Sequence, residues 1–381
     1  MPSKALIFAV GASVAASVAY GQESFTPLAQ KRFEYTNLPY KADTGTGERG
    51  TQFGYNICNS TTESQTSLCQ TAMINSLDDF CLWGPPEPNS LIGNTEGEAV
   101  AWCTKLGRGT RLIPAGALTG VQFMRTRSYI QVTGHIKQDL INIAANDDGG
   151  EMDPHGADQR GNPLGGLIFS NAFPSNGGNN NTFQQVVEWH NFMGANLFCL
   201  KACDPADPDD DKYCEHIFDR IGCTYNAPAA YKDGVFESCE GENQDFPGIY
   251  TSNGQVMTYT QPPESLGAIS TMPYNPRVPA SSNCVTFQSS AIYTGGVSVS
   301  APAASTSGSA GAASNTATAA ASGTARPSGA SGTSARTSAA SSTATNAGAS
   351  NGAVGLTSPA FGFMTIGSLV FSALVGALVV L

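Results

Sequence analysis

The residues best suited to chemistry lie in one short segment, Glu151-Met-Asp-Pro-His-Gly-Ala-Asp158. It carries four ionisable side chains, which are those of Glu151, Asp153, His155 and Asp158. Such a set can hold a divalent cation, or supply the acid and the base that cleave a glycoside. Glycine and proline in the same run are also typical of an ordinary polar loop, in which aspartates cap backbone groups. These four residues are our candidate catalytic residues, with the polar loop as the alternative.

The rest of the chain offers little support for catalysis. We find no histidine pair at helical spacing, no glycine-rich phosphate loop and no serine elbow in the sequence. Trp189, between Glu188 and His190, could stack a sugar, but the helical register expected there places it in the core. His216 is interpreted as a surface or boundary residue. The sequence therefore predicts no metal site and no cofactor, and it favours a protein that is not an enzyme.

The cysteine count depends on the compartment for its meaning. There are ten cysteines: Cys58, Cys69, Cys81, Cys103, Cys199, Cys203, Cys214, Cys223, Cys239 and Cys284. In an exported chain this even number predicts five disulfides, whereas in a cytosolic chain it would indicate metal or redox chemistry. The first four are expected to pair among themselves, in one of three connectivities. Cys199 and Cys203 are expected to pair elsewhere, because a bridge between them inside a helix would be strained.

The N-terminus predicts export. Residues 1–21 have one positive charge, an apolar run and then small residues, which is the pattern of a cleavable signal peptide. The apolar run is too short for a membrane span. Residues 22–32 form a lead-in that ends in Lys31-Arg32, either a dibasic processing site or an ordinary charged pair.

The C-terminus predicts a lipid anchor on a stalk. Residues 294–350 consist almost wholly of Ala, Ser, Thr and Gly, which favours a disordered, O-glycosylated stalk. Residues 351–381 end in an apolar tail with no basic residue after it, as in a GPI-attachment signal. Asn351 or Ser350 is the expected attachment residue. The alternative is a single transmembrane helix, which the missing positive flank disfavours.

Residues 33–293 are the part expected to fold, as a single disulfide-rich α+β domain with antiparallel strands and several short helices. Capping boxes at 67–70, 95–98 and 182–185 predict three helices, and a fourth is expected to run from Cys214 to Ile221. Alternating and β-branched segments predict strands. These are 121–125, 129–134, 140–144, 165–169, 235–236, 248–250 and 256–260. A proline-rich strap should follow, tied down by Cys284.

Charge and sequons bear on partners. The formal net charge of −11, without clustered Lys and Arg, argues against nucleic-acid binding and suits a soluble extracellular domain. Two N-x-[ST] sequons predict N-glycans at Asn59 and Asn180, both in polar segments.

Several longer motifs resemble those of one protein family. They are RGTQFGYNICNSTTESQTSLCQT, DDFCLWGPPEPNS, NTEGEAVAWCTK, GTRLIPAGALTGVQF, GGEMDPHGADQRGNP, EWHNFMGANLFCLKACDP, CEHIFDRIGC and GVFESCEG. Together they resemble the fungal, chiefly basidiomycete, secreted proteins called macrophage-activating glycoprotein-like, across about residues 33 to 290. The resemblance implies a secreted or cell-surface fungal glycoprotein with a Ser/Thr-rich tail. It implies no catalytic residue.

The sequence thus favours a GPI-anchored, glycosylated wall or cell-surface protein without enzymatic activity, whose partners are wall glycans or host-cell receptors met through its sugars. One alternative is a surface-tethered module that binds glycan, haem or a metal ion. Another is a hydrolase of wall polysaccharide that uses acidic residues between 151 and 158.

Overall fold

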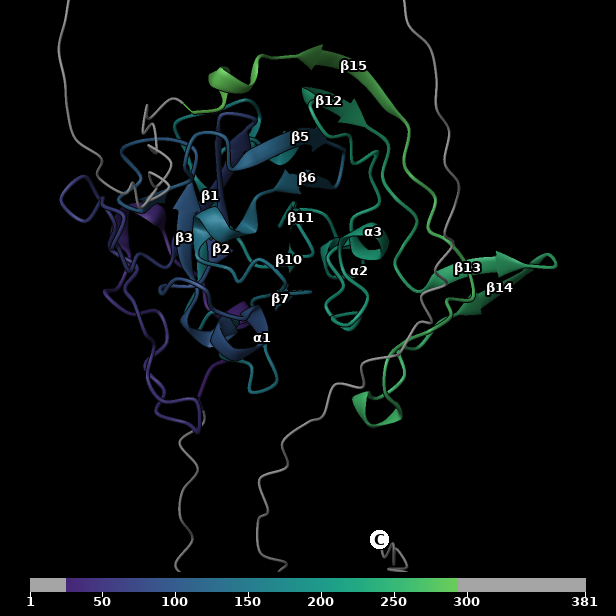
Figure 1. Cartoon of the computed structure of the whole chain (residues 1–381), viewed down its shortest axis with the longest axis horizontal. Coiled ribbons are helices and arrows are strands. Elements are labelled where there is room, and N and C mark those ends of the chain that lie inside the picture. Colours follow the sequence, from purple (N-terminus) through teal and green to yellow (C-terminus); the bar gives the residue numbers. More distant parts are fainter. Residues whose placement is uncertain (1–24, 294–381) are drawn as a thin grey trace, which may run out of the picture. The chain divides into compact units, whose positions relative to one another are not determined.

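Two β-sheets that pack face to face form the framework of the structure (Figure 1). The computed structural model describes residues 25–293, which fall in one compact unit. The predicted signal peptide, stalk and anchor signal, with Ser350 and Asn351, lie outside the described residues. Between residues 25 and 293, no helix combines the length and the apolar character needed to cross a bilayer.

The larger sheet has seven strands and is mostly antiparallel, with one parallel pair, β5 and β12. In spatial order its strands are β15 (Ser281–Thr286), β12 (Phe236–Gly241), β5 (Leu118–Arg125), β6 (Tyr129–Ile136), β11 (Leu197–Cys203), β10 (Trp189–Gly194) and β7 (Gly150–Met152). β7 is therefore an edge strand, beside β10.

The smaller sheet has six strands and mixes parallel with antiparallel pairs. Its order is β4 (Arg111–Leu112), β3 (Val100–Cys103), β2 (Asp79–Gly84), β1 (Thr71–Ser76), β8 (Leu167–Ser170) and β9 (Gln184–Val186). A separate hairpin pairs β13 (Ile249–Ser252) with β14 (Gln255–Thr258). The α-helices of the described chain have four residues each: α1 (Ile92–Thr95), α2 (Asp210–Tyr213) and α3 (Cys223–Asn226).

The core lies between the two sheets. Trp83 of β2 and Trp189 of β10 are buried there with ring centroids 5.9 Å apart. Phe80 of β2 and Phe198 of β11 stack at 6.3 Å. The backbone N–H of Trp83 donates to Oδ1 of Asn191 at 2.9 Å, which links the sheets by a polar contact as well. Each such large side chain contributes about 1.5–3 kcal/mol by leaving water.

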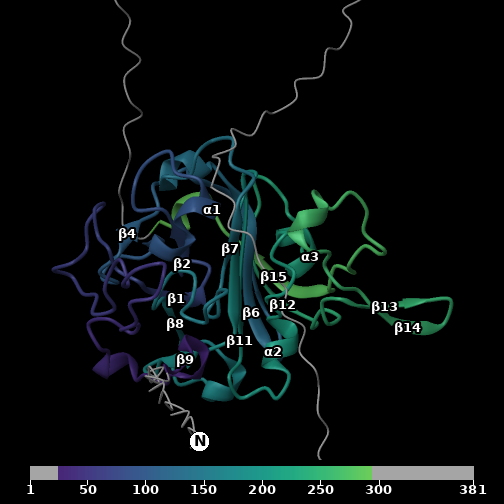
Figure 2. The same ribbon diagram turned by 90° about the horizontal axis from the view of Figure 1, so that it is seen from below.

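The other face of the larger sheet is covered by α2, α3 and the loop between them (Figure 2). Two disulfides fasten this cover to β11: Cys203–Cys214 and Cys199–Cys223. Residues four apart in a strand point to the same side, so both cysteines of β11 face the cover. The prediction that Cys199 and Cys203 pair elsewhere is confirmed, but the reason is different, because they lie in a strand and not in a helix.

The remaining disulfides are Cys58–Cys69, Cys81–Cys103 and Cys239–Cys284. All ten cysteines are bridged, as the count predicts, and the first four pair among themselves. The last bridge joins β12 to β15, after the proline-rich segment, which agrees with a strap tied down at Cys284.

The first predicted helix is wrong. The residues after Ser67 form β1, which pairs with β2 and β8. The polar side chains of the apparent capping box bond distant backbone instead of a helix end. The Ser67 hydroxyl donates to the carbonyl of Gly109 at 2.8 Å, and the Gln70 amide donates to that of Ala99 at 2.9 Å. Tertiary partners thus outweigh a local cap.

The helix predicted after Thr182 is also wrong. That segment forms β9, β10 and β11, and the side-chain amide of Gln185 donates to the carbonyl of Lys31. β10 and β11 are joined by Ala195-Asn196, which have φ of 50° and 60°. Two central residues with positive φ make a type I′ hairpin turn, which matches the twist of the flanking strands.

Two further segments differ from the prediction, and one is reduced. Residues 214–221 do not form a helix, because α2 ends at Tyr213 and the disulfide at Cys214 follows. The strand expected at 140–144 is replaced by a 3-10 helix, Gln138–Ile141. The capping box at 95–98 contributes only one 3-10 turn, Glu96–Glu98, after α1.

The other predicted strands correspond to β5, β6, β8, β12, β13 and β14. The α+β class is thus corrected to a mostly β fold of mixed sheets with a few one-turn helices and five disulfides.

Candidate functional site

The acidic segment found in the sequence begins on the edge strand β7. β7 is antiparallel to β10, with Met152 opposite Asn191 and Glu151 opposite Phe192. Met152 and Asn191 face the core, so Glu151 points to the opposite side, toward the cover. Continuing this register places Asp153 beside His190 and His155 beside Glu188. The alternation therefore puts the acidic residues and the histidines of two chain segments on one face.

This face opens into a cleft of about 700 Å³. Five carboxylate side chains lie along its wall, together with His216 and Arg220. The carboxylates are Glu96, Glu151, Asp153, Asp219 and Glu264. They come from four parts of the chain: the 3-10 turn after α1, the edge strand β7 with the loop after it, the cover, and the segment after β14.

Burial and mutual repulsion disfavour the ionised forms of several cleft carboxyls. Burial, helped by the negative charges of Asp153 and Asp219, raises the pKa of Glu96 to about 7. Glu151 is fully buried, and burial with the same neighbours raises its pKa well above the usual range. Its Oε1 has no hydrogen-bond partner within residues 25–293. Burial also raises the pKa of Asp153, although the backbone N–H groups of His155 and Gly156 donate to its Oδ1.

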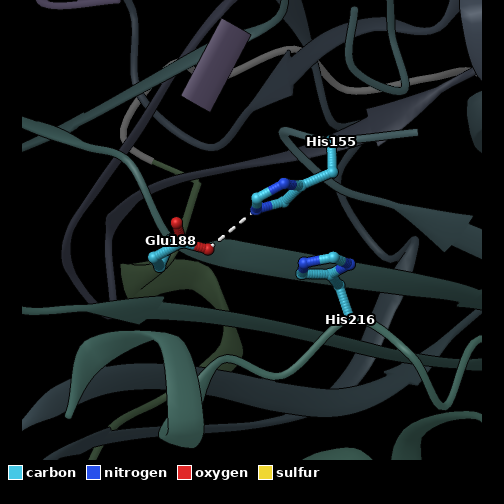
Figure 3. A group of neighbouring side chains, drawn as sticks. All are labelled: His155, Glu188 and His216. Carbon is cyan, nitrogen blue, oxygen red and sulfur yellow. Dashed lines mark hydrogen bonds and ion pairs between the residues drawn. The ribbon is translucent and has the colours of Figure 1, made fainter. Parts of the chain in front are cut away.

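Beside the cleft, two histidines and a glutamate meet (Figure 3). Nε2 of His155 lies 2.9 Å from Oε2 of Glu188, and both side chains are only partly exposed, at 23% and 15%. The rings of His155 and His216 stack with centroids 3.7 Å apart and planes 17° apart. Burial lowers the pKa of His155, but the hydrogen bond and the charge of Glu188 outweigh it, so the net shift is upward.

Different backbone elements hold each of the three side chains. The peptide N–H of Cys203 donates to the carbonyl of Glu188 at 3.0 Å, which extends the β10–β11 ladder to that residue. His155 lies in the loop after β7, and its peptide N–H is held by Asp153 at 2.7 Å. His216 lies two residues after Cys214, whose disulfide to Cys203 fixes this part of the cover over Glu188.

Asp158, the fourth candidate from the sequence, has a different place. It forms an ion pair with Arg49, and both side chains are about one-third exposed. Burial raises the pKa of Asp158, but the hydrogen bonds from Arg49 and from the backbone N–H of Arg160 outweigh this effect. The net shift of its pKa is therefore downward. The structure therefore brings Glu151 and Asp153 to the cleft and His155 to the group beside it, and it assigns Asp158 to the contact with the N-terminal segment.

Sequence reasoning missed four carboxylates of this region: Glu96, Glu188, Asp219 and Glu264. Glu96, Asp219 and Glu264 reach the cleft from distant segments, and no local pattern connects them. Glu188 could have been found, because Glu188 and His190 alternate in the same way as Asp153 and His155. The wrong helix assignment hid that signal.

The geometry allows two kinds of chemistry. Carboxyl groups of raised pKa in a cleft are suited to proton donation near neutral pH. Two imidazoles with a carboxylate are suited to binding a transition-metal ion. The two sequon residues, Asn59 and Asn180, lie on exposed loops away from strands.

Comparison with known proteins identifies relatives. Over 225 residues the chain is 42% identical to the appressorium protein ROW2 of Mycosarcoma maydis, and the aligned residues cover 58% of this chain and 74% of ROW2. Over 256 residues it is 46% identical to the appressorium protein ROW1 of the same fungus, and the aligned residues cover 67% of this chain and 55% of ROW1. No family model and no solved structure matches the chain. At these identities and coverages, the chain belongs to the fungal family of the appressorium proteins ROW1 and ROW2.

Proposed function

We propose that this protein is a GPI-anchored glycoprotein of the fungal cell surface, which acts by binding and not by catalysis. We propose further that it serves at the appressorium, the infection structure after which its relatives are named. The observation that carries the proposal is the 42% and 46% identity to two appressorium proteins. Five disulfides support export, because such bridges persist in oxidising compartments.

The proposed partners are wall glycans, or host-cell receptors that meet its attached sugars. Exposed Asn59 and Asn180 are accessible to glycosylation, and the Ser/Thr-rich residues 294–350 would carry O-linked sugars. The resemblance to macrophage-activating glycoprotein-like proteins fits this picture, since such a name describes an effect on host cells. The anchor would attach at Asn351 or Ser350.

The test uses the full chain, tagged after the signal peptide and expressed in its fungus. Phosphatidylinositol-specific phospholipase added to intact cells should release the tagged protein, and a chain that stops at residue 349 should appear in the medium without the enzyme. Deletion of the gene should impair appressoria while vegetative growth continues. Protein that stays in the membrane pellet after phospholipase treatment would contradict the anchor, and a normal appressorium in the deletion strain would contradict the role.

A second candidate function is hydrolysis of wall polysaccharide. It is favoured by one observation, the carboxyls of Glu96 and Glu151 with raised pKa in an open cleft. If it is correct, the purified protein releases reducing sugar from wall polymers, and Glu151→Gln abolishes the release. Asp158→Asn is the matched control, because Asp158 lies outside the cleft lining. Equal activity in both variants, or none in the unaltered protein, would eliminate this candidate.

A further inference from the structure

We propose that His155, Glu188 and His216 form a binding site for one divalent transition-metal ion, such as Zn²⁺ or Cu²⁺. The three residues offer two imidazole nitrogens and one carboxylate oxygen, which all lie within 4.8 Å of one another (Figure 3). This site does not depend on the proposed surface role, because it rests on the folded domain alone.

The donor atoms need only small movements to reach coordination distance. On a tetrahedral zinc ion with bonds of about 2.0–2.2 Å, neighbouring donors lie about 3.4 Å apart. The present hydrogen bond between His155 and Glu188 is 2.9 Å long, so it would open by about 0.5 Å. His216 would approach by about 1.4 Å at most from the 4.8 Å limit. Partly exposed side chains can make such shifts by rotating about their own bonds.

The orientation of the rings suits a shared ion. Figure 3 shows the stacked rings of His155 and His216 with a nitrogen of each on the side where the Glu188 carboxylate lies. An ion between these three atoms would replace the hydrogen bond with two metal bonds and add a third from His216. The partial exposure of His155 and Glu188 leaves a side open for a water molecule or an external ligand.

The backbone around the site is fixed before any ion binds. Glu188 belongs to the β10–β11 ladder, His155 is held by Asp153, and His216 is tied to β11 through Cys214. A preorganised donor set loses little entropy on binding, because its side chains are already ordered near their bound positions. The disulfide Cys203–Cys214 is thus a positioning device for one ligand.

The donor types indicate the class of ion. Ca²⁺ and Mg²⁺ prefer sets made of oxygen atoms, whereas imidazole suits zinc, copper and nickel. The other group with suitable spacing in the described chain, Glu237 with Cys239 and Cys284, cannot act in the same way, since both sulfurs are joined in a disulfide. Of these two groups in the described chain, only the one with the two histidines keeps all three donor atoms available.

The experiment titrates the full-length protein, purified from its fungus and stripped with a chelator, with Zn²⁺ against a chromogenic competitor. We expect one equivalent to bind. Loss of a residue that only supports a metal ligand weakens binding by about 10–100-fold. His216→Gln removes a ligand itself, so it should weaken zinc binding by more than this. Glu188→Gln should do the same. His135→Gln is the matched control, because His135 lies on β6 and its ring contacts the carbonyl of Tyr231.

Two further measurements keep the result decisive. Co²⁺ should give a visible absorption band that disappears in His216→Gln, and near-ultraviolet circular dichroism should show that each variant is folded. His216 makes no side-chain hydrogen bond among the described residues, so its replacement should leave the fold intact. The proposal is overturned if less than one equivalent binds, or if His216→Gln and Glu188→Gln bind zinc as tightly as the unaltered protein and His135→Gln.

Discussion

Two arginine–aspartate pairs join the N-terminal segment to the end of the acidic segment and to Arg160 just after it, and the pairs differ chiefly in exposure. Asp43 and Arg160 have side chains that are 2% and 5% exposed, and the guanidinium also donates to the carbonyls of Gly45 and Gly50. In the second pair, Arg49 and Asp158 are 33% and 36% exposed. We expect the same isosteric change, Asp to Asn, to have very different effects in the two pairs.

Asp43→Asn leaves the Arg160 charge buried without its counter-charge. Breaking a buried pair in this way costs about 3–5 kcal/mol of unfolding free energy. For a domain of this size, that loss corresponds to a fall of roughly 6–20 °C in Tm. Asp158→Asn removes a charge that water already screens, so it should cost at most about 1 kcal/mol. The longer contact of 3.9 Å between Asp158 and Arg160 adds little to this.

Denaturant unfolding, followed by the fluorescence of the buried tryptophans, measures both losses. A double variant, Asp43→Asn with Arg160→Met, buries no unpaired charge and should recover much of the stability lost in Asp43→Asn. The reasoning fails if Asp43→Asn and Asp158→Asn lower the unfolding free energy by the same amount. It also fails if the loss in the double variant equals the sum of the losses in its two single variants.

Other predictions follow from the same structure. Glu96 has a pKa of about 7 in the folded protein, against an ordinary value of 4.5, so its contribution to stability is present below pH 4.5 and is lost as the pH rises toward 7. Glu96→Gln should therefore flatten the dependence of Tm on pH in that window. An unchanged slope would contradict this prediction. Replacing Cys239 and Cys284 by Ser opens a loop of sequence separation 45, which should cost about 4 kcal/mol in denaturant unfolding; a loss below 1 kcal/mol would show that the bridge is dispensable. Ala195→Gly relieves a φ of 50° in the β10–β11 turn and should raise stability by up to about 1 kcal/mol, whereas a fall in Tm would argue against a type I′ turn.

Sequence reasoning predicted strands well where the alternation was local. The segments of β5 and β6 show apolar and polar residues in turn, and they form a hairpin with one face in the core. Helices were wrong for a physical reason. A Ser-x-x-Gln pattern indicates only that a hydroxyl and an amide need hydrogen-bond partners. For Ser67 and Gln70, those partners lie in segments far along the chain.

The candidate site was half predictable. Glu151, Asp153 and His155 could be named, because they are neighbours in the sequence and alternate along β7 and the residues that follow it. Glu96, His216 and Asp219 could not, since only the sheet pairing and the two bridges at Cys199 and Cys203 bring them near β7. The spacing of those two cysteines was informative once read as i and i+4 in a strand, where both fasten the same cover.

The central claim is that an exported β domain holds its histidine-bearing cover in place by two disulfides on one strand. Peptide mapping of the protein purified from cells without reduction tests it most directly. We expect no free thiol among the ten cysteines, and cross-linked peptides that join Cys203 to Cys214 and Cys199 to Cys223. Free thiols at these positions, or a bridge between Cys199 and Cys203, would contradict the account.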